Sequence, residues 1–133
     1  MRHHIGKVTC LVLLGGLIGC SDSSGTEALE ICTNPVTLTV GAGTTPKISW
    51  SPACLANQVV INEQGGGPAW AMFFVVDSNP LRPPVHYGVV QAGALGTPTS
   101  PAPLTAGTTY NVNLFVDPVG GPAELIGTKS VTP

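Results

Sequence analysis

The sequence has few charged side chains and few aromatic ones. Of its 133 residues, 9% are charged and 5% are aromatic, with five Lys or Arg, seven Asp or Glu and three His. Without a basic excess, the chain lacks the electrostatic footprint of a nucleic-acid-binding protein, and that partner class is disfavoured. Glycine and proline are abundant, at 17 and 13 residues, and 43% of residues are hydrophobic. This balance predicts short strands joined by turns, because it suits neither long helices nor a disordered chain.

The sequence also lacks an apolar run long enough to cross a bilayer. The uncharged run 8–18 is about half of the roughly 20 residues that a spanning helix needs. Arg2 and Lys7 precede this run, and Gly19 and Cys20 follow it. A positive head, a short apolar run and a small-residue exit are typical of a secretory signal peptide.

The end of this segment, Leu17-Ile18-Gly19-Cys20, resembles the lipobox of bacterial lipoproteins. The resemblance implies cleavage after residue 19, a diacylglyceryl group on Cys20, and attachment to a membrane of the bacterial cell envelope through that lipid. Two acyl chains suffice for stable anchoring, whereas one gives only marginal binding. Ser21, where Asp would imply retention at the inner membrane, favours the outer membrane in a Gram-negative cell. Two alternatives stay open: an ordinary signal peptide with an unrelated cysteine, and an uncleaved anchor.

We therefore divide the chain into a signal peptide (1–19), lipidated Cys20 with a flexible tether (20–31), and one β domain (32–133). As a flexible coil, the polar stretch 21–30 spans roughly 18 Å, so the domain should lie close to its membrane. The cleaved chain is acidic overall, with three basic residues against seven acidic ones: Lys47, Arg82 and Lys129 against Asp22, Glu27, Glu30, Glu63, Asp77, Asp117 and Glu124.

Cys32 and Cys54 are the two cysteines left in the domain. Apolar and polar residues alternate in 36–40 and 47–50, which predicts two half-buried strands around a turn at 41–46. Antiparallel pairing with Leu38 opposite Ile48 would place Cys32 opposite Cys54, near the separation a disulfide requires. Because the compartment outside the cytoplasm permits disulfides, we predict this bond; two separate reduced thiols are the alternative.

Further strands are predicted from apolar runs and turn residues. They span 58–62, 70–76, 85–90 and 124–131, with a loop at 93–103 and an alternating strand that contains Val112, Leu114 and Val116. Just before this strand, Leu104, Gly107 and Tyr110 have a Leu-x-x-Gly-x-x-Tyr spacing.

This spacing resembles the tyrosine corner of fibronectin type III and related immunoglobulin-like domains, over about residues 33–132. The resemblance implies an all-β, fibronectin type III-like β-sandwich of about seven strands. It also implies that the Tyr110 hydroxyl bonds to backbone a few residues upstream, with Gly107 as turn former and Leu104 as apolar prop. Trp50 matches the core tryptophan of that pattern. The position of Cys32–Cys54 differs from the inter-sheet disulfide of antibody domains, and Trp70 lies outside the usual pattern.

Groups for catalysis or metal binding are sparse. His86 is the one histidine after cleavage, and a hydrolase would need it with Asp77 or Asp117 and a serine, but no nucleophile-elbow motif is present. We predict no catalytic residue, no metal and no cofactor. The candidate binding surface consists of Trp70, Phe73 and Phe115; coverage of these rings by a neighbouring strand or loop is the alternative.

The preferred function is a non-catalytic, membrane-anchored envelope lipoprotein whose domain contacts an envelope protein or polysaccharide. A carbohydrate or small-ligand binder, using the loops around Gly65–Trp70 and Gly120-Gly121, is the second hypothesis. A small hydrolase that uses His86 is the third.

Overall fold

The structure is a computed structural model that describes residues 28–75 and 78–133. The predicted signal peptide, with Leu17, Ile18, Gly19 and Cys20, lies outside the described residues, and so does Asp77. The described part contains eight β-strands and no helix: β1 (Thr37–Val40), β2 (Lys47–Ser51), β3 (Gln58–Glu63), β4 (Pro68–Phe73), β5 (Val85–His86), β6 (Leu95–Thr97), β7 (Tyr110–Val116) and β8 (Glu124–Val131).

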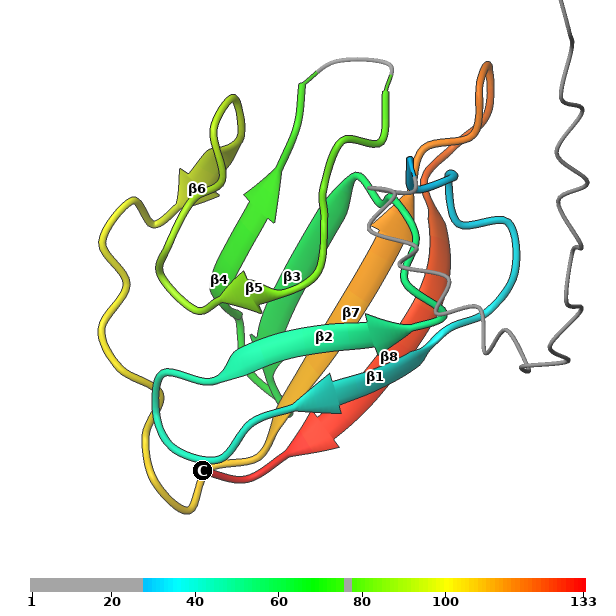
Figure 1. The fold of residues 1–133 in the computed structure, drawn as a ribbon. Helices are drawn as coiled ribbons and strands as arrows, with labels where there is room; N and C mark the ends of the chain where they lie inside the picture. Colours follow the sequence, from blue (N-terminus) through cyan, green and yellow to red (C-terminus); the bar gives the residue numbers. More distant parts are fainter. Residues whose placement is uncertain (1–27, 76–77) are drawn as a thin grey trace, which may run out of the picture.

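The strands form two antiparallel sheets, with the orders β1-β2-β5 and β6-β4-β3-β7-β8. In Figure 1 the three-stranded sheet lies in front of the five-stranded one. The prediction of an all-β fold is confirmed, and the two sheets are consistent with a β-sandwich.

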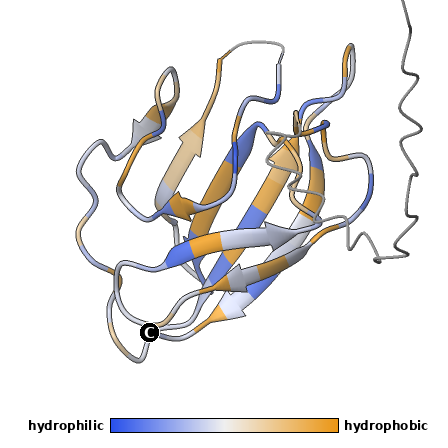
Figure 2. Cartoon of the chain, viewed as in Figure 1, coloured by the Kyte–Doolittle hydropathy of each residue, from blue (hydrophilic) through white to orange (hydrophobic). Residues whose placement is uncertain are grey.

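Strict alternation of side chains builds the core between the sheets. Along β7, every second residue from Tyr110 to Val116 is buried, and Val59 and Ile61 of β3 are fully buried beside them. Hydrophobic and hydrophilic residues accordingly alternate along the strands in Figure 2. Ile48 and Trp50 of β2 complete the core from the other sheet.

The predicted register of the first hairpin is wrong by two residues. Leu38 lies opposite Trp50, and Val40 lies opposite Ile48. The predicted pairing would have put Val40 opposite Pro46, which has no N–H to donate. Instead, the Gly41 N–H donates to the Lys47 carbonyl at 2.8 Å, and Pro46 stays in the turn. Because side chains alternate with a period of two, the shift leaves the same residues facing the core.

The predicted disulfide between Cys32 and Cys54 is confirmed, with a Cα–Cα distance of 5.0 Å. The prediction that the two cysteines lie opposite each other in an antiparallel strand pair is wrong, however. Ile31 and Leu55 form a parallel bridge, in which the Cys32 N–H donates to the Leu55 carbonyl and the Leu55 N–H donates to the Glu30 carbonyl. The segment before β1 therefore runs beside the β2–β3 connection, and this second contact brings the sulfurs together.

Three other predictions of strand boundaries differ from the structure. The strand expected over 70–76 is β4, which begins at Pro68 and ends at Phe73. The expected strand 85–90 ends at His86, because Tyr87 and Gly88 turn the chain, with Gly88 at φ +77°. The expected loop 93–103 contains β6, which pairs with the outer edge of β4. Such a short strand has little periodicity of its own and depends on its neighbour for hydrogen bonds.

Candidate binding surface

The prediction that Trp70 is part of an exposed binding surface is wrong. Its side chain is 0% exposed, and its ring lies 5.4 Å from that of Tyr87. The indole Nε1 has no hydrogen-bond partner among the described residues. Trp70 lies opposite Ile61, and the alternation of β4 puts it on the same inward face as Met72. This alternation was already visible in the sequence.

Phe73 and Phe115 lie near each other on the outer face of the five-stranded sheet. Both pair with Gln58 of β3, one from each side, and both rings are half-buried. Because directly paired residues point to one face, the three side chains form a line across the sheet. The structure thus brings these two predicted residues together and separates them from Trp70.

Two leucines that the sequence analysis missed extend this line. Leu95 of β6 pairs with Phe73, and Leu125 of β8 pairs with Phe115. Leu95 is 52% exposed and Leu125 is 54% exposed. We call the set Leu95, Phe73, Gln58, Phe115 and Leu125 the apolar row. No sequence signal identifies it, since its five members come from five strands.

The same face becomes polar farther along the strands. Thr128 donates to the Asn113 side-chain oxygen at 2.9 Å, and Ser130 donates to that of Asn111 at 2.7 Å. These groups hydrogen-bond to each other across β7 and β8, so they hold the edge of the sheet with polar contacts. The apolar row is therefore bounded by polar side chains on β7 and β8, whereas Val60 and Ala71 continue the same face on β3 and β4.

Of the residues assigned to the tyrosine corner, Tyr110 begins β7, and Leu104 and Gly107 lie in the connection before it. The Thr105 N–H donates to the Tyr110 hydroxyl oxygen at 3.0 Å, and both Tyr110 and Leu104 are buried. Gly107 has φ +80°, which favours glycine, and its N–H donates to the Pro133 carbonyl. Trp50 is also buried, and its Nε1 donates to the Cys54 carbonyl at 2.8 Å.

No hydrogen bond joins His86 to Asp117 in the part of the chain that the structure describes. His86 is exposed on β5, opposite Lys47. Asp117 follows β7, and its N–H donates to the Asn79 side-chain oxygen at 2.7 Å. Among residues 28–75 and 78–133, no group of three or more His, Cys, Asp or Glu side chains is placed to hold a metal ion.

The two glycine-rich loops of the ligand-binding hypothesis lie at opposite ends of the sheet. Glu63, where the first loop begins, pairs with Tyr110 at the start of β7, whereas Gly120-Gly121 follows the end of β7. The first loop is closed as a hairpin, because the Gly66 N–H donates to the Glu63 carbonyl and the Glu63 N–H donates to the Gly67 carbonyl. The loops cannot form one joint site.

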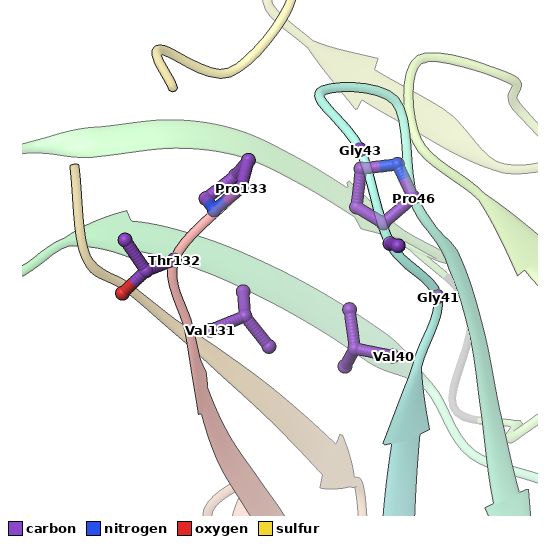
Figure 3. A pocket seen from close by; sticks show the side chains of 8 residues that line it. Val40, Gly41, Gly43, Pro46, Val131, Thr132 and Pro133 are labelled. Carbon is purple, nitrogen blue, oxygen red and sulfur yellow. The ribbon is translucent and has the colours of Figure 1, made fainter. Parts of the chain in front are cut away.

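A hollow of about 340 Å³ lies between the β1–β2 turn and the C-terminal residues. Figure 3 shows Val40 and Pro46 on one side, and Val131, Thr132 and Pro133 on the other. The polar side chain in its lining is Thr132, whose hydroxyl pairs with that of Thr109 at 2.9 Å. The hollow thus offers shape but no free charged or polar side chain to recognise a ligand.

Comparison with protein-family models, curated proteins and solved structures finds no match to this chain. Within the described residues, no helix has the length and apolar character needed to cross a membrane. The class that the structure defines is an all-β domain of two antiparallel sheets, with a disulfide between the start of the domain and the β2–β3 connection.

Proposed function

We propose that this protein is a membrane-anchored lipoprotein of the bacterial cell envelope, whose non-catalytic domain binds an envelope protein through the apolar row. The observation that carries the binding role is the alignment of Phe73 and Phe115 on either side of Gln58. Their strands are two positions apart, or about 10 Å at the usual strand spacing. Aromatic side chains on a sheet face are typical of the centre of a protein interface.

The anchor is supported by the sequence Leu17-Ile18-Gly19-Cys20 at the end of a signal-peptide pattern. The lipid on Cys20 attaches the protein to a membrane, and Ser21 favours the outer membrane in a Gram-negative cell. The Cys32–Cys54 bond is compatible with an oxidising compartment outside the cytoplasm.

A fibronectin type III-like identity of the domain is supported by its strand order. β1, β2 and β5 share a sheet as strands A, B and E do, and β3, β7 and β8 are neighbours as strands C, F and G are. The Tyr110 hydrogen bond near the start of β7 adds the contact expected of a tyrosine corner. β6 is an addition to this pattern.

Site-specific photo-crosslinking in cells tests the binding role. A photoreactive amino acid at position 115 should form an adduct with one envelope protein. The matched positions are Asn113, two residues along the same face, and Thr39, which is exposed on β1 of the other sheet. Adducts of equal yield at all three positions, or none at 115, would contradict the proposal.

Metabolic labelling with a fatty-acid analogue tests the anchor. We expect label and membrane fractionation for the wild type, and neither for Cys20→Ala. Label in both proteins, or in neither, would remove Cys20 from the proposal.

A further inference from the structure

The apolar row has the same residue order from either end. Across the sheet its members are Leu95, Phe73, Gln58, Phe115 and Leu125, so each side of the central glutamine carries a phenylalanine and then a leucine. An interface between two identical copies requires a surface that is complementary to itself. The apolar row meets this condition, because a rotation by 180° about an axis along β3 exchanges its two halves.

Among the described residues, the five strands of this sheet present no charged side chain on their outer face. The charged residues in these strands are Glu63, Glu124 and Lys129. Each pairs with a buried core residue, which is respectively Tyr110, Val116 and Val112. Because directly paired side chains share a face, all three charges belong to the inner face. Two copies of this acidic chain can therefore join their outer faces without placing like charges opposite each other.

The centre of the outer face follows the middle strand, β3. Gln58, Val60 and Asn62 occupy alternate positions there and pair with outward-facing residues of β7. With an axis along β3, each of these side chains meets the same side chain of the second copy. A primary amide carries both donors and an acceptor, so it can pair with an identical amide through two reciprocal hydrogen bonds. The valine meets a valine between the two amide pairs.

The outer face is large enough for a specific dimer, though near the lower limit. Five strands at the usual spacing and three rows of paired side chains cover roughly 500 Å² per copy, or about 1,000 Å² in total. A specific interface buries at least about 1,000 Å². The other large hydrophobic residues that are exposed lie outside the strands, so the register places no row of them on a sheet: Ile31, Val75, Val89, Val90 and Val119.

We infer that the envelope protein bound by the apolar row is a second copy of this chain, packed face to face about a twofold axis along β3. This inference rests on the proposed binding role of the apolar row. In this arrangement Phe73 packs against the partner's Phe115, and Gln58 faces the partner's Gln58. The strands of the two outer faces then run nearly aligned, as they do in ordinary packing of one sheet on another.

Photo-crosslinking between two tagged copies tests the inference. One cell produces the full-length protein with two different epitope tags, and the first copy carries a photoreactive amino acid at position 115. We expect a product that has the mass of a dimer and carries both tags, with the link in a peptide that contains Phe73 of the second copy. The same photoreactive group at position 39, which is exposed on β1 of the other sheet, should give no such product.

Charge exchange at position 58 distinguishes a second copy from any other partner. Gln58→Glu in both copies, or Gln58→Lys in both, places like charges face to face and should lower the yield of the doubly tagged product by at least about tenfold. Gln58→Glu in one copy with Gln58→Lys in the other should restore the yield, which also shows that both variants fold. Thr39→Glu in both copies is the matched control and should leave the yield unchanged.

The outcomes separate this inference from the proposed binding role. If position 115 links to a different envelope protein and no product carries both tags, the second copy is wrong and the binding role of the apolar row stands. If both tags are joined but like charges at position 58 do not lower the yield, the twofold axis along β3 is wrong. If position 115 forms no adduct at all, both proposals fail.

Discussion

Tyr110 and Tyr87 are both buried, but their hydroxyls act in opposite directions. The Tyr110 oxygen accepts a hydrogen bond from the Thr105 N–H, whereas the Tyr87 hydroxyl donates to the Ala102 carbonyl at 2.8 Å. Each bond ties the long 98–109 connection to the core. A hydrogen bond lost in such a place leaves a backbone group unpaired, which costs more than the bond itself contributes.

Tyr110→Phe should lower the free energy of unfolding by about 1–3 kcal/mol, because the Thr105 N–H loses its acceptor. Denaturant unfolding of the full chain measures the loss. Thr109→Val is the control: its hydroxyl pairs with that of Thr132 at the surface, so its loss should stay within about 0.5 kcal/mol. Equal losses of unfolding free energy in the two variants would show that the buried hydrogen bond stabilises the fold no more than the exposed one.

Stability should fall in alkaline solution because of Tyr87. Burial, and next the electrostatic effect of Tyr110, raise the pKa of Tyr87 above its usual value of 10.0. The folded state thus favours the protonated phenol, and this contribution is complete below pH 10 and lost as pH rises through the raised pKa. Unfolding curves between pH 8 and pH 11 should show the decline, and Tyr87→Phe should flatten it. An unchanged slope in Tyr87→Phe would assign the decline to other groups.

At the scale of elements, the two sheets approach most closely where β1 crosses β8. The Val36 N–H donates to the Ile126 carbonyl at 2.8 Å, and Gly127 lies beneath Val36 and Leu38. A Cβ at position 127 would meet a Val36 side-chain carbon at 3.0 Å and the Val36 carbonyl oxygen at 3.3 Å. A glycine here therefore sets the distance between the sheets at their edge.

Gly127→Ala should destabilise the protein by about 1–3 kcal/mol, as overpacking of a close contact does. Gly67→Ala is its control, because a Cβ there would meet nothing within 4 Å. Thermal unfolding of the two variants tests the difference. A Gly127→Ala protein as stable as the wild type would mean that β1 can move away from β8 without loss.

The disulfide fixes the segment before β1 to the β2–β3 connection. Its two cysteines are 22 residues apart, so the bond should stabilise the fold by about 3 kcal/mol through loop closure in the unfolded chain. We expect the double variant Cys32→Ala with Cys54→Ala to unfold at lower denaturant than the wild type. Reductant should bring the wild type to the same midpoint and leave the double variant unchanged. A wild type insensitive to full reduction would show that the bond adds no stability.

At the scale of the whole molecule, both tryptophans belong to the interior. Trp70 is 0% exposed and Trp50 is 4% exposed, and they lie on different sheets. The large apolar side chains that reach the surface are aliphatic or are the half-buried rings of Phe73 and Phe115. We therefore expect recognition by this domain to use the proposed apolar row, because neither indole is exposed for contact.

The native tryptophan emission should resist acrylamide until the protein unfolds, and soluble glycans should not change it. Val119→Trp supplies the comparison, because the indole replaces a 96% exposed side chain and should be quenched freely. Steady-state fluorescence in solution is sufficient. Ready quenching of the wild type would mean that Trp70 is open to solvent and would revive the ligand-binding hypothesis.

Much of the fold was predictable because it depends on local alternation. The inward faces of β2, β3 and β7, and the length of β8, follow from period-two patterns that a one-dimensional reading detects. The prediction of a strand over 85–90 was wrong because the chain turns at Gly88. β6 was missed because three residues between the turn at Gly93 and Pro98 carry too little pattern to separate a strand from a loop.

By itself, the sequence determined which side of each long strand is apolar, which cysteines could pair, and where the signal-peptide pattern with Cys20 ends. These are properties of residue type and short spacing. Tertiary structure alone decided the pairing of Leu38 with Trp50, the parallel contact of Ile31 with Leu55, and the alignment of Phe73 with Phe115 through Gln58. Each of these depends on hydrogen bonds between distant segments, and strand spacing and register are set only when those segments meet.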